Sequence, residues 1–224
     1  MRMIVKTSRV DLFYEKYGAG APLILIHGNG EDHTIFEEAA ALLKEYFTVY
    51  AIDSRGHGNS SPVTELHYED MADDVYEFII KLQIENPIVY GFSDGGIIAL
   101  LLSIKYPTLL SRIIVSGVNS HPFGVELKTY FAILLDYFKR KSYFTKLMLV
   151  EPHITKKMLR KIVIPVHITS GSGDLIRQNH MRKMAKCIKK CTYTVFQNET
   201  HGSYITHSEK IGEYIIKVCV KNKS

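Results

Sequence analysis

The sequence predicts an α/β protein with a mostly parallel, eight-stranded sheet that carries helices on both faces. Segments with strand character alternate with segments with helix character along most of the chain, as in proteins with parallel sheets. Strand segments such as Pro22–Ile26 are continuous apolar runs, which is typical of strands buried on both faces. The chain has 224 residues, 46% hydrophobic and 23% charged, so we expect residues 1–224 to form one domain with a large core.

The expected elements follow in order along the chain. Two short alternating segments, Met3–Lys6 and Val10–Tyr17, end at a glycine turn and predict an antiparallel pair of strands. The further expected strands are Pro22–Ile26, Phe47–Ile52, Ile88–Tyr90, Ser111–Ser116, Ile164–Thr169 and Tyr193–Phe196. The expected helices are Asp32–Lys44, Tyr68–Leu82, Gly95–Tyr106, Gln178–Ile188 and Ser208–Val220, with a helix-rich insert at about 119–161.

Charge and cysteine usage exclude several classes of protein. The net charge of +5 is mildly basic, and no long Lys/Arg run accompanies it, so we expect no nucleic-acid partner. The cysteines, Cys187, Cys191 and Cys219, are odd in number, which argues against a disulfide framework and favours a reducing compartment. No second pair or nearby histidine completes a zinc site around them, so we expect no metal.

Targeting signals are also not expected. Met1–Val10 has no apolar stretch long enough for a signal peptide. The longest apolar run, around Ile97–Leu102, is far too short to span a bilayer, so we expect no stable membrane insertion. These observations predict a cytoplasmic protein.

The segment Gly91–Gly96 reads GFSDGG and contains the pattern G-x-S-x-G between an expected strand and an expected helix. This is the pattern of a nucleophile elbow, a sharp turn that holds the central serine in a strained conformation at the edge of a sheet. Gly91 and Gly95 supply the missing side chains that such crowding requires. The helix N-terminus that follows favours developing negative charge. Ser93 is therefore the expected nucleophile.

The strand Leu23–Ile26 leads into a second loop, His27–Gly30, which reads HGNG. A tetrahedral intermediate of acyl transfer needs two hydrogen-bond donors aimed at one oxygen. We expect these donors to be the backbone N–H groups of Asn29 and of Asp94, the residue after the nucleophile. The side chains of both residues are then secondary, and His27 is interpreted as a structural hydrogen-bonding residue.

The chain has ten histidines, and their positions in the sequence indicate which of them is the general base. The chain order Ser, Asp/Glu, His removes every histidine that precedes Ser93. Of those that follow, His201 lies in the polar segment Asn198–Gly202, directly after the last expected strand. His167 lies inside an expected strand and is interpreted as a core residue. His201 is therefore the expected base.

The acid that orients the base must lie between Ser93 and His201, at the end of a strand. Asp174 meets this condition, because it directly follows the segment 170–173 after the strand Ile164–Thr169. The end of the preceding strand, 116–119, carries no carboxylate. We therefore expect Asp174 to hold the tautomer of His201 and to stabilise its protonated form.

With these motifs, and with Asp53–Ser60 reading DSRGHGNS, the chain resembles the α/β-hydrolase superfamily along nearly its whole length. In that family the DSRGHGNS-like loop is structural, so Arg55 and His57 are interpreted as structural here. The resemblance implies the α/β-hydrolase fold, an acyl-enzyme mechanism without cofactor, and a lid at the position of the insert. The elbow is similar to those of small esterases, amino-acid ester hydrolases and some carbon–carbon bond hydrolases.

The insert suggests the size and charge of the substrate. Apolar residues at helical spacing form one face that could either line an acyl pocket or pack against the core: Leu127, Tyr130, Phe131, Leu134, Tyr137 and Phe138. From His121 to Lys161 there are nine Lys/Arg and three Asp/Glu residues, which suggests an outer solvated surface or a preference for acidic substrates or anionic lipid. A short lid favours a small to medium acyl substrate.

The first functional hypothesis is a carboxylesterase whose partner is a small-molecule ester. The second is a hydrolase that cleaves another bond (amide, thioester or carbon–carbon) with the same residues. The third is a ligand-binding or sensory protein with little turnover. Fast turnover of a simple ester would separate the first hypothesis from the third. Fold alone does not choose among the reactions.

Overall fold

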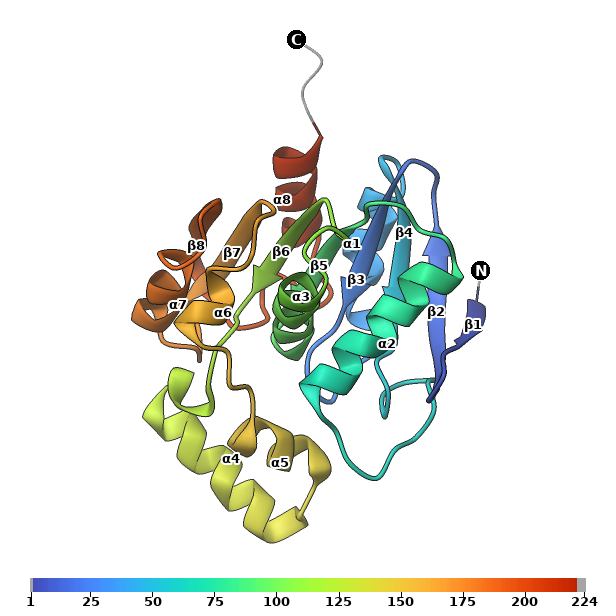
Figure 1. Cartoon of the computed structure of the whole chain (residues 1–224). Coiled ribbons are helices and arrows are strands. Elements are labelled where there is room, and N and C mark those ends of the chain that lie inside the picture. Colours follow the sequence, from blue (N-terminus) through green and yellow to red (C-terminus); the bar gives the residue numbers. More distant parts are fainter. Residues whose placement is uncertain (1, 221–224) are drawn as a thin grey trace.

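The computed structural model describes residues 2–220, in which one twisted sheet lies between two layers of helices (Figure 1). The strands are β1 (Arg2–Lys6), β2 (Asp11–Tyr17), β3 (Ala21–Ile26), β4 (Phe47–Ile52), β5 (Ile88–Phe92), β6 (Arg112–Ser116), β7 (Val166–Gly173) and β8 (Cys191–Thr200). The helices are α1 (Glu37–Leu43), α2 (Tyr68–Lys81), α3 (Asp94–Lys105), α4 (Leu127–Arg140), α5 (Tyr143–Val150), α6 (Lys156–Leu159), α7 (Gln178–Ala185) and α8 (Lys210–Cys219), with 3₁₀ turns η1 (His33–Phe36) and η2 (Pro122–Gly124).

The sheet has the strand order β1-β2-β4-β3-β5-β6-β7-β8. The pairs β1–β2 and β2–β4 are antiparallel, and every later pair is parallel. The predicted fold class, a mostly parallel eight-stranded sheet with helices on both faces, is confirmed. Because the parallel strands run the same way, the loops after their carboxyl ends meet along one edge, where ligands bind in such sheets.

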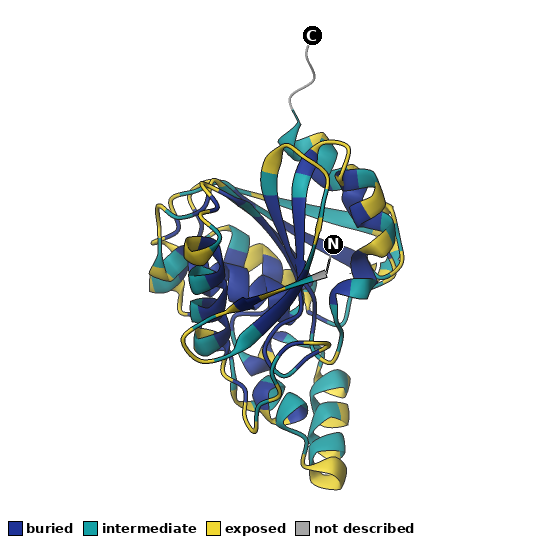
Figure 2. Ribbon diagram, turned by 90° about the vertical axis from the view of Figure 1, so that its right-hand side faces the viewer, coloured by how far each residue is buried: buried dark blue, intermediate teal, exposed yellow. Residues whose placement is uncertain are grey.

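Side chains of each central strand alternate between the two faces of the sheet. Leu23 and Leu25 belong to the cluster formed with α1 and α8, whereas Ile24 and Ile26 belong to the cluster formed with α2 and α3. In Figure 2 the central strands are largely buried, and the helices on either side combine buried residues with intermediate and exposed ones. The continuous apolar run in β3 is therefore explained by burial on both faces.

Three strands end later than the sequence predicts: β5 ends at Phe92 instead of Tyr90, and β7 and β8 are longer still. β7 ends at Gly173 instead of Thr169, and β8 ends at Thr200 instead of Phe196. The added residues of β7 and β8 are mostly polar or glycine, and such residues are not typical of strands. They are extended here because the two backbones pair with each other past a β-bulge at Gly171–Gly173. A Cβ at Gly171 would lie 2.3 Å from the carbonyl oxygen of Glu199, so only glycine permits this close approach.

The insert divides into two parts. Helices α4 and α5 project from the carboxyl edge of the sheet, while α6 contacts α3 in the body (Figure 1). Lys141 ends α4 in the left-handed conformation (φ 48°), and the Ser142 hydroxyl accepts a hydrogen bond from the Phe144 N–H (3.2 Å) to begin α5. None of the residues of α4 is buried.

Two further features concern the chain as a whole. No helix within residues 2–220 combines the length and the apolar character that crossing a bilayer requires. Cys187, Cys191 and Cys219 are each half-buried and unpaired.

The expected helix over Asp32–Lys44 begins as the 3₁₀ turn η1, in which the Asp32 side chain accepts the Thr34 N–H.

Candidate active site

Ser93 lies between the end of β5 and the start of α3, in a strained backbone conformation (φ 51°, ψ −113°). A Cβ at Gly91 would lie 2.2 Å from the carbonyl oxygen of Gly95, and a Cβ at Gly95 would lie 2.1 Å from that of Ile26. Real Cβ atoms do not approach backbone so closely. The two glycines therefore make the turn possible, and the turn holds Ser93 at the carboxyl edge of the sheet.

The structure brings Ser93, His201 and Asp174 together. His201 Nε2 lies 3.1 Å from the Ser93 hydroxyl, and His201 Nδ1 lies 2.7 Å from Asp174 Oδ1. The three residues directly follow β5, β8 and β7. The carboxylate of Asp174 is fully buried, whereas 17% of the His201 side chain is exposed. Because Nδ1 donates to the carboxylate, Nε2 is left to accept the hydroxyl proton.

Close packing fixes the imidazole and the carboxylate. Asp174 Oδ1 also accepts the N–H of Ile176 (2.8 Å), whereas Oδ2 has no hydrogen-bond partner among the described residues. A Cβ at Gly117 (φ +59°) would lie 2.5 Å from His201 Cε1, so this position must be glycine for the ring to fit. The ring of Phe92 packs on the other side of His201 (4.9 Å between centroids).

The loop His27–Gly30 lies directly beside Ser93, since a Cβ at Gly28 would lie 3.2 Å from the Cβ of Ser93. The side chains of Asn29 and Asp94 are bonded to each other: Asn29 Nδ2 donates to Asp94 Oδ2 (2.7 Å). Asn29 Nδ2 also lies 3.4 Å from the carbonyl oxygen of Phe144 in α5. The two residues expected to supply backbone donors are thus linked through their side chains, which the sequence analysis treats as secondary.

Tyr68, the first residue of α2, completes this link. Its hydroxyl donates to Asp94 Oδ1 (2.7 Å), and both side chains are buried. Burial raises the pKa of the Asp94 carboxyl, while burial and the charge of Asp94 raise the pKa of the Tyr68 hydroxyl well above its ordinary value. Nothing in the sequence pattern singles out Tyr68, because the contact joins positions 26 residues apart.

Glu31 is a second residue that sequence reasoning misses. Its carboxylate accepts the N–H of Gly28 (3.0 Å) and lines the cavity in front of Ser93. Burial raises the pKa of this carboxyl. Glu31 therefore fixes the conformation of the loop and is the only carboxylate in the lining of that cavity.

The cavity at Ser93 has a volume of about 290 Å³. Its walls combine the polar residues just described with Phe92, Thr129, Ile133, Met148 and Leu175. Helix α4 contributes Thr129 and Ile133, and α5 contributes Met148. Of the predicted apolar face of the insert, Leu127, Phe131 and Phe138 are 53–68% exposed, so for these three both expectations, pocket lining and core packing, are wrong.

His27 and Arg55, which the sequence suggests are structural residues, hydrogen-bond other protein groups near the carboxyl edge. His27 Nδ1 bonds the carbonyl of Gly28 (2.7 Å), and Nε2 accepts the N–H of Ser54 (3.0 Å). Burial lowers the pKa of His27 to about 4. Arg55 Nε forms a buried ion pair with Asp74 (2.5 Å). His27 therefore connects two loops at the carboxyl edge in its neutral form.

His167 and His33 lie outside the cavity at Ser93. His167 is half-buried on β7, near Arg112 and the Tyr214 hydroxyl. The expectation that it is a core residue is therefore wrong.

Asp32, His33 and Asp53 place possible metal-ligand atoms within 4.8 Å of one another. These atoms already hydrogen-bond protein groups, as in the 2.7 Å contact of His33 Nδ1 with Asp53 Oδ1, and we assign the cluster a structural role.

Fold and site together define an α/β-hydrolase. Residues 21–158 match the family model for the alpha/beta hydrolase fold, and the chain belongs to this family. It is 30% identical over 264 aligned positions to AB hydrolase superfamily protein YisY of Bacillus subtilis (strain 168), with 94% of this chain and 96% of that protein covered. It is 31% identical over 133 positions to the serine hydrolase BPHL of Mus musculus, with 56% and 46% covered.

Two solved structures illustrate the shared fold. The esterase EaEST from Exiguobacterium antarcticum superimposes with a TM-score of 0.83 at 21% identity, covering 97% of this chain and 99% of that chain. The enol-lactonase from Burkholderia xenovorans LB400 gives a TM-score of 0.82 at 18% identity, with 98% and 100% covered. The protein is therefore a hydrolase of the α/β-hydrolase superfamily.

Proposed function

We propose that this hydrolase cleaves carboxylic esters of small to medium acyl groups through an acyl-enzyme on Ser93. The observation that carries the proposal is the continuous chain of hydrogen bonds from Ser93 through His201 to Asp174 at the edge of the sheet. A serine on a strained elbow, with a neutral imidazole as acceptor, is the arrangement that acyl transfer needs. Relatives whose names state an esterase activity support the same choice.

The first half of the reaction forms the acyl-enzyme. His201 Nε2 takes the proton of the Ser93 hydroxyl as its oxygen attacks the ester carbon. The backbone N–H groups of Asn29 and Asp94 hold the oxyanion of the tetrahedral intermediate. The carbon–oxygen bond to the alcohol then breaks, and the proton on His201 passes to the departing alkoxide. Buried Asp174 stabilises the imidazolium between these steps.

The second half releases the acid. His201 removes a proton from water, the hydroxide attacks the acyl carbon, and the bond to the Ser93 oxygen breaks as that oxygen regains the proton. Apart from the ester and water, these steps use only groups of this chain, so we propose that the enzyme needs no cofactor. A cavity of about 290 Å³ with apolar walls suits a short acyl chain. In this proposal α4 and α5 act as the lid.

The test is hydrolysis of p-nitrophenyl esters of increasing chain length. Wild type, Ser93→Ala and the control Ser103→Ala are compared, because Ser103 is a buried serine of α3 whose hydroxyl bonds only a helix carbonyl (2.8 Å). We expect kcat/KM to fall at least about a thousandfold for Ser93→Ala. Ser103→Ala should keep wild-type activity.

Two results would contradict the proposal. Equal activity in Ser93→Ala and wild type would exclude Ser93 as the nucleophile. Saturable binding of esters by the wild type without turnover would favour the binding-protein hypothesis. Covalent labelling of Ser93 without ester turnover would retain the nucleophile and transfer the proposal to amide, thioester or carbon–carbon substrates.

A further inference from the structure

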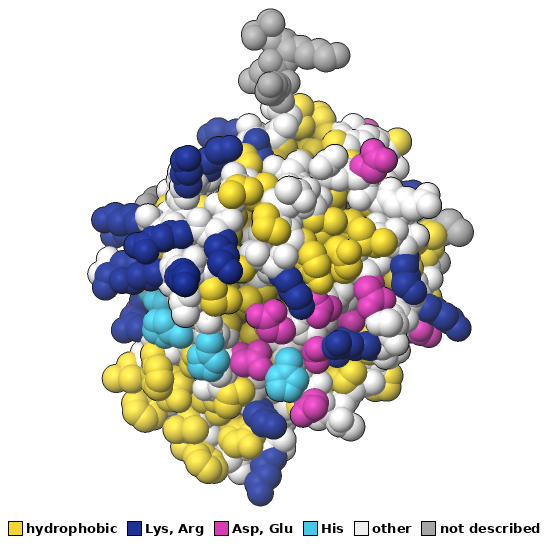
Figure 3. Space-filling view, viewed as in Figure 1, with side chains coloured by type: hydrophobic (Ala, Val, Ile, Leu, Met, Phe, Trp, Pro, Cys, Tyr) yellow, Lys and Arg dark blue, Asp and Glu magenta, His cyan; other side chains and the backbone are white. Residues whose placement is uncertain are grey.

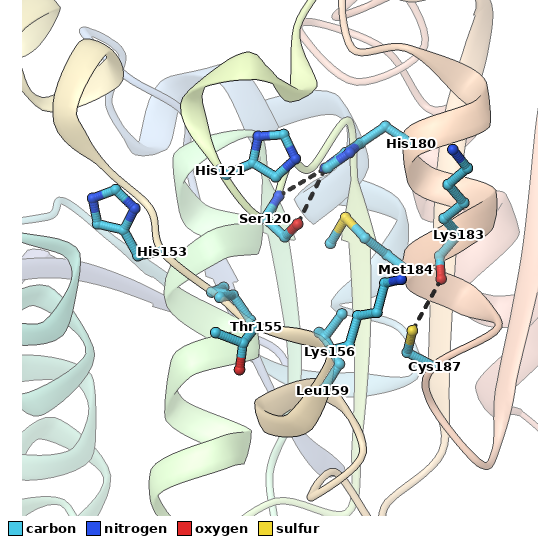
Figure 4. A pocket seen from close by; sticks show the side chains of 11 residues that line it. Ser120, His121, His153, Thr155, Lys156, Leu159, His180, Lys183, Met184 and Cys187 are labelled. Atoms are coloured by element: carbon cyan, nitrogen blue, oxygen red, sulfur yellow. Dashed lines mark hydrogen bonds between the residues drawn. The ribbon is translucent and has the colours of Figure 1, made fainter.

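A second cavity, of about 380 Å³, lies between α6, α7 and the loop after β6, and shares no lining residue with the cavity at Ser93 (Figure 4). Its wall is partly apolar, formed by Ile154, Leu159 and Met184. Lys156 extends from α6 toward Met184 on α7 in the close-up view. The reaction described above uses none of these residues.

This cavity adjoins a larger, polar hollow of about 840 Å³. The two share His121, Lys156, His180 and Lys183, and the hollow adds Arg177 and Arg182. The opposing carboxylates are few: in the lining of the hollow they are Glu126 and Asp174, and Asp174 is bonded to His201. A cationic rim therefore borders an apolar wall.

The two lysines shared by both spaces have no carboxylate within 4.0 Å among residues 2–220. The surrounding sequence is also short of negative charge, since 152–198 contains ten Lys/Arg residues and a single Asp/Glu, Asp174. Figure 3 shows the Lys and Arg side chains gathered on this side of the molecule, next to histidines. Lys156 and Lys183 are both exposed, and neither forms an ion pair within residues 2–220.

The pKa values of the two histidines in the cavity, His121 and His180, are consistent with the same positive potential. The Ser120 N–H donates to His180 Nε2 (3.0 Å), and the rings of His121 and His180 meet edge to face (4.7 Å between centroids). Burial, and then His121, Arg177 and Lys183, lower the pKa of His180 to about 4. Burial and Arg177 lower the pKa of His121 as well. Protonation of these histidines is disfavoured because they are partly buried and lie near cationic side chains.

We propose that this cavity binds a small organic anion with a short apolar body. The anionic group lies between Lys156 and Lys183, and the body packs on Ile154, Leu159 and Met184. Cationic side chains without protein partners beside an apolar wall are the elements that such a ligand requires. The site is separate from Ser93 and does not depend on the proposed esterase activity.

The test is binding of hexanoate to the full chain, measured by calorimetry and by the histidine ring signals in NMR. We expect a Kd below about 1 mM, with at least about tenfold weaker binding of the neutral hexanamide and of hexylammonium. The ring signals of His121 and His180 should shift, while that of His201 should not.

Matched variants locate the site. Lys156→Met with Lys183→Met keeps the apolar stem and removes both charges, so hexanoate affinity should fall at least about tenfold while hexanamide affinity stays unchanged. Lys189→Met with Lys190→Met removes two exposed charges that line neither the cavity nor the hollow, and should bind hexanoate as wild type does. Equal affinities for hexanoate and hexanamide, shifts centred on His201, or an unaffected double variant at 156 and 183 would each overturn the proposal.

Discussion

The catalytic edge of the sheet and the lid helices differ in how strongly their surroundings specify each residue. At the edge, Gly91, Gly95 and Gly117 each approach backbone or His201 so closely that a Cβ would not fit. In the lid, α4 has no buried residue, and Leu135 is 61% exposed. The comparison shows that close packing restricts the residue type around Ser93 and His201. On the solvent-facing side of α4, no such packing restricts the residue type.

The largest expected effect comes from Asp174. Replacing it by Asn keeps the shape but favours the wrong tautomer of His201, so kcat for an ester substrate should fall about 10³- to 10⁴-fold. The control Asp136→Asn removes a half-buried carboxylate of α4 that pairs with Arg140 (3.0 Å), and should leave kcat unchanged. Equal losses of kcat in Asp174→Asn and Asp136→Asn would contradict the proposal that Asp174 acts in catalysis and Asp136 does not.

The next effect is on folding. Gly95→Ala places a Cβ against the backbone of Ile26, and we expect the free energy of unfolding to fall by about 3 kcal/mol. At Gly173 the nearest atom to an added Cβ is 3.5 Å away, so Gly173→Ala should change stability by less than about 1 kcal/mol. Urea unfolding measures both. A smaller loss in Gly95→Ala than in Gly173→Ala would contradict the steric account of the elbow.

A third prediction concerns the side-chain link between the expected oxyanion donors. Tyr68→Phe removes the hydroxyl that holds Asp94, and we expect kcat to fall about tenfold with little change in KM, because the donors matter most in the transition state. The control Tyr106→Phe removes a similar hydrogen bond to Asp73 (3.0 Å) away from the site. If both variants lose only stability, Tyr68 has no positioning role.

The smallest effect is expected in the lid. Leu135→Ser should change the free energy of unfolding by less than about 0.5 kcal/mol, because the side chain already faces solvent. Leu147→Ala in α5 removes a side chain that is 1% exposed and should lose about 2–5 kcal/mol. Chemical unfolding of the pair shows whether the outer face of α4 is free. A large loss at Leu135 would show that this face packs against something.

The sequence predicts the fold and the three residues of the hydrogen-bonded chain because each leaves a local signal. Ser93 is marked by its flanking glycines, and Asp174 and His201 by their places after strands. Tyr68 and Glu31 leave no such signal, since their roles arise from contacts across the tertiary structure. The orientation of α4 is missed for another reason. Its apolar face is wide, and part of that face (Leu127, Phe131, Leu135 and Phe138) is exposed, so periodicity alone does not show which part is turned toward the body of the protein.

The most direct test of the central claim is reaction with a fluorophosphonate, followed by mass spectrometry of the peptides. The account predicts one adduct, on the peptide that contains Ser93, formed at least about a hundredfold more slowly in His201→Ala because the hydroxyl then lacks its base. An adduct on another residue, or an equal rate in the two proteins, would contradict it.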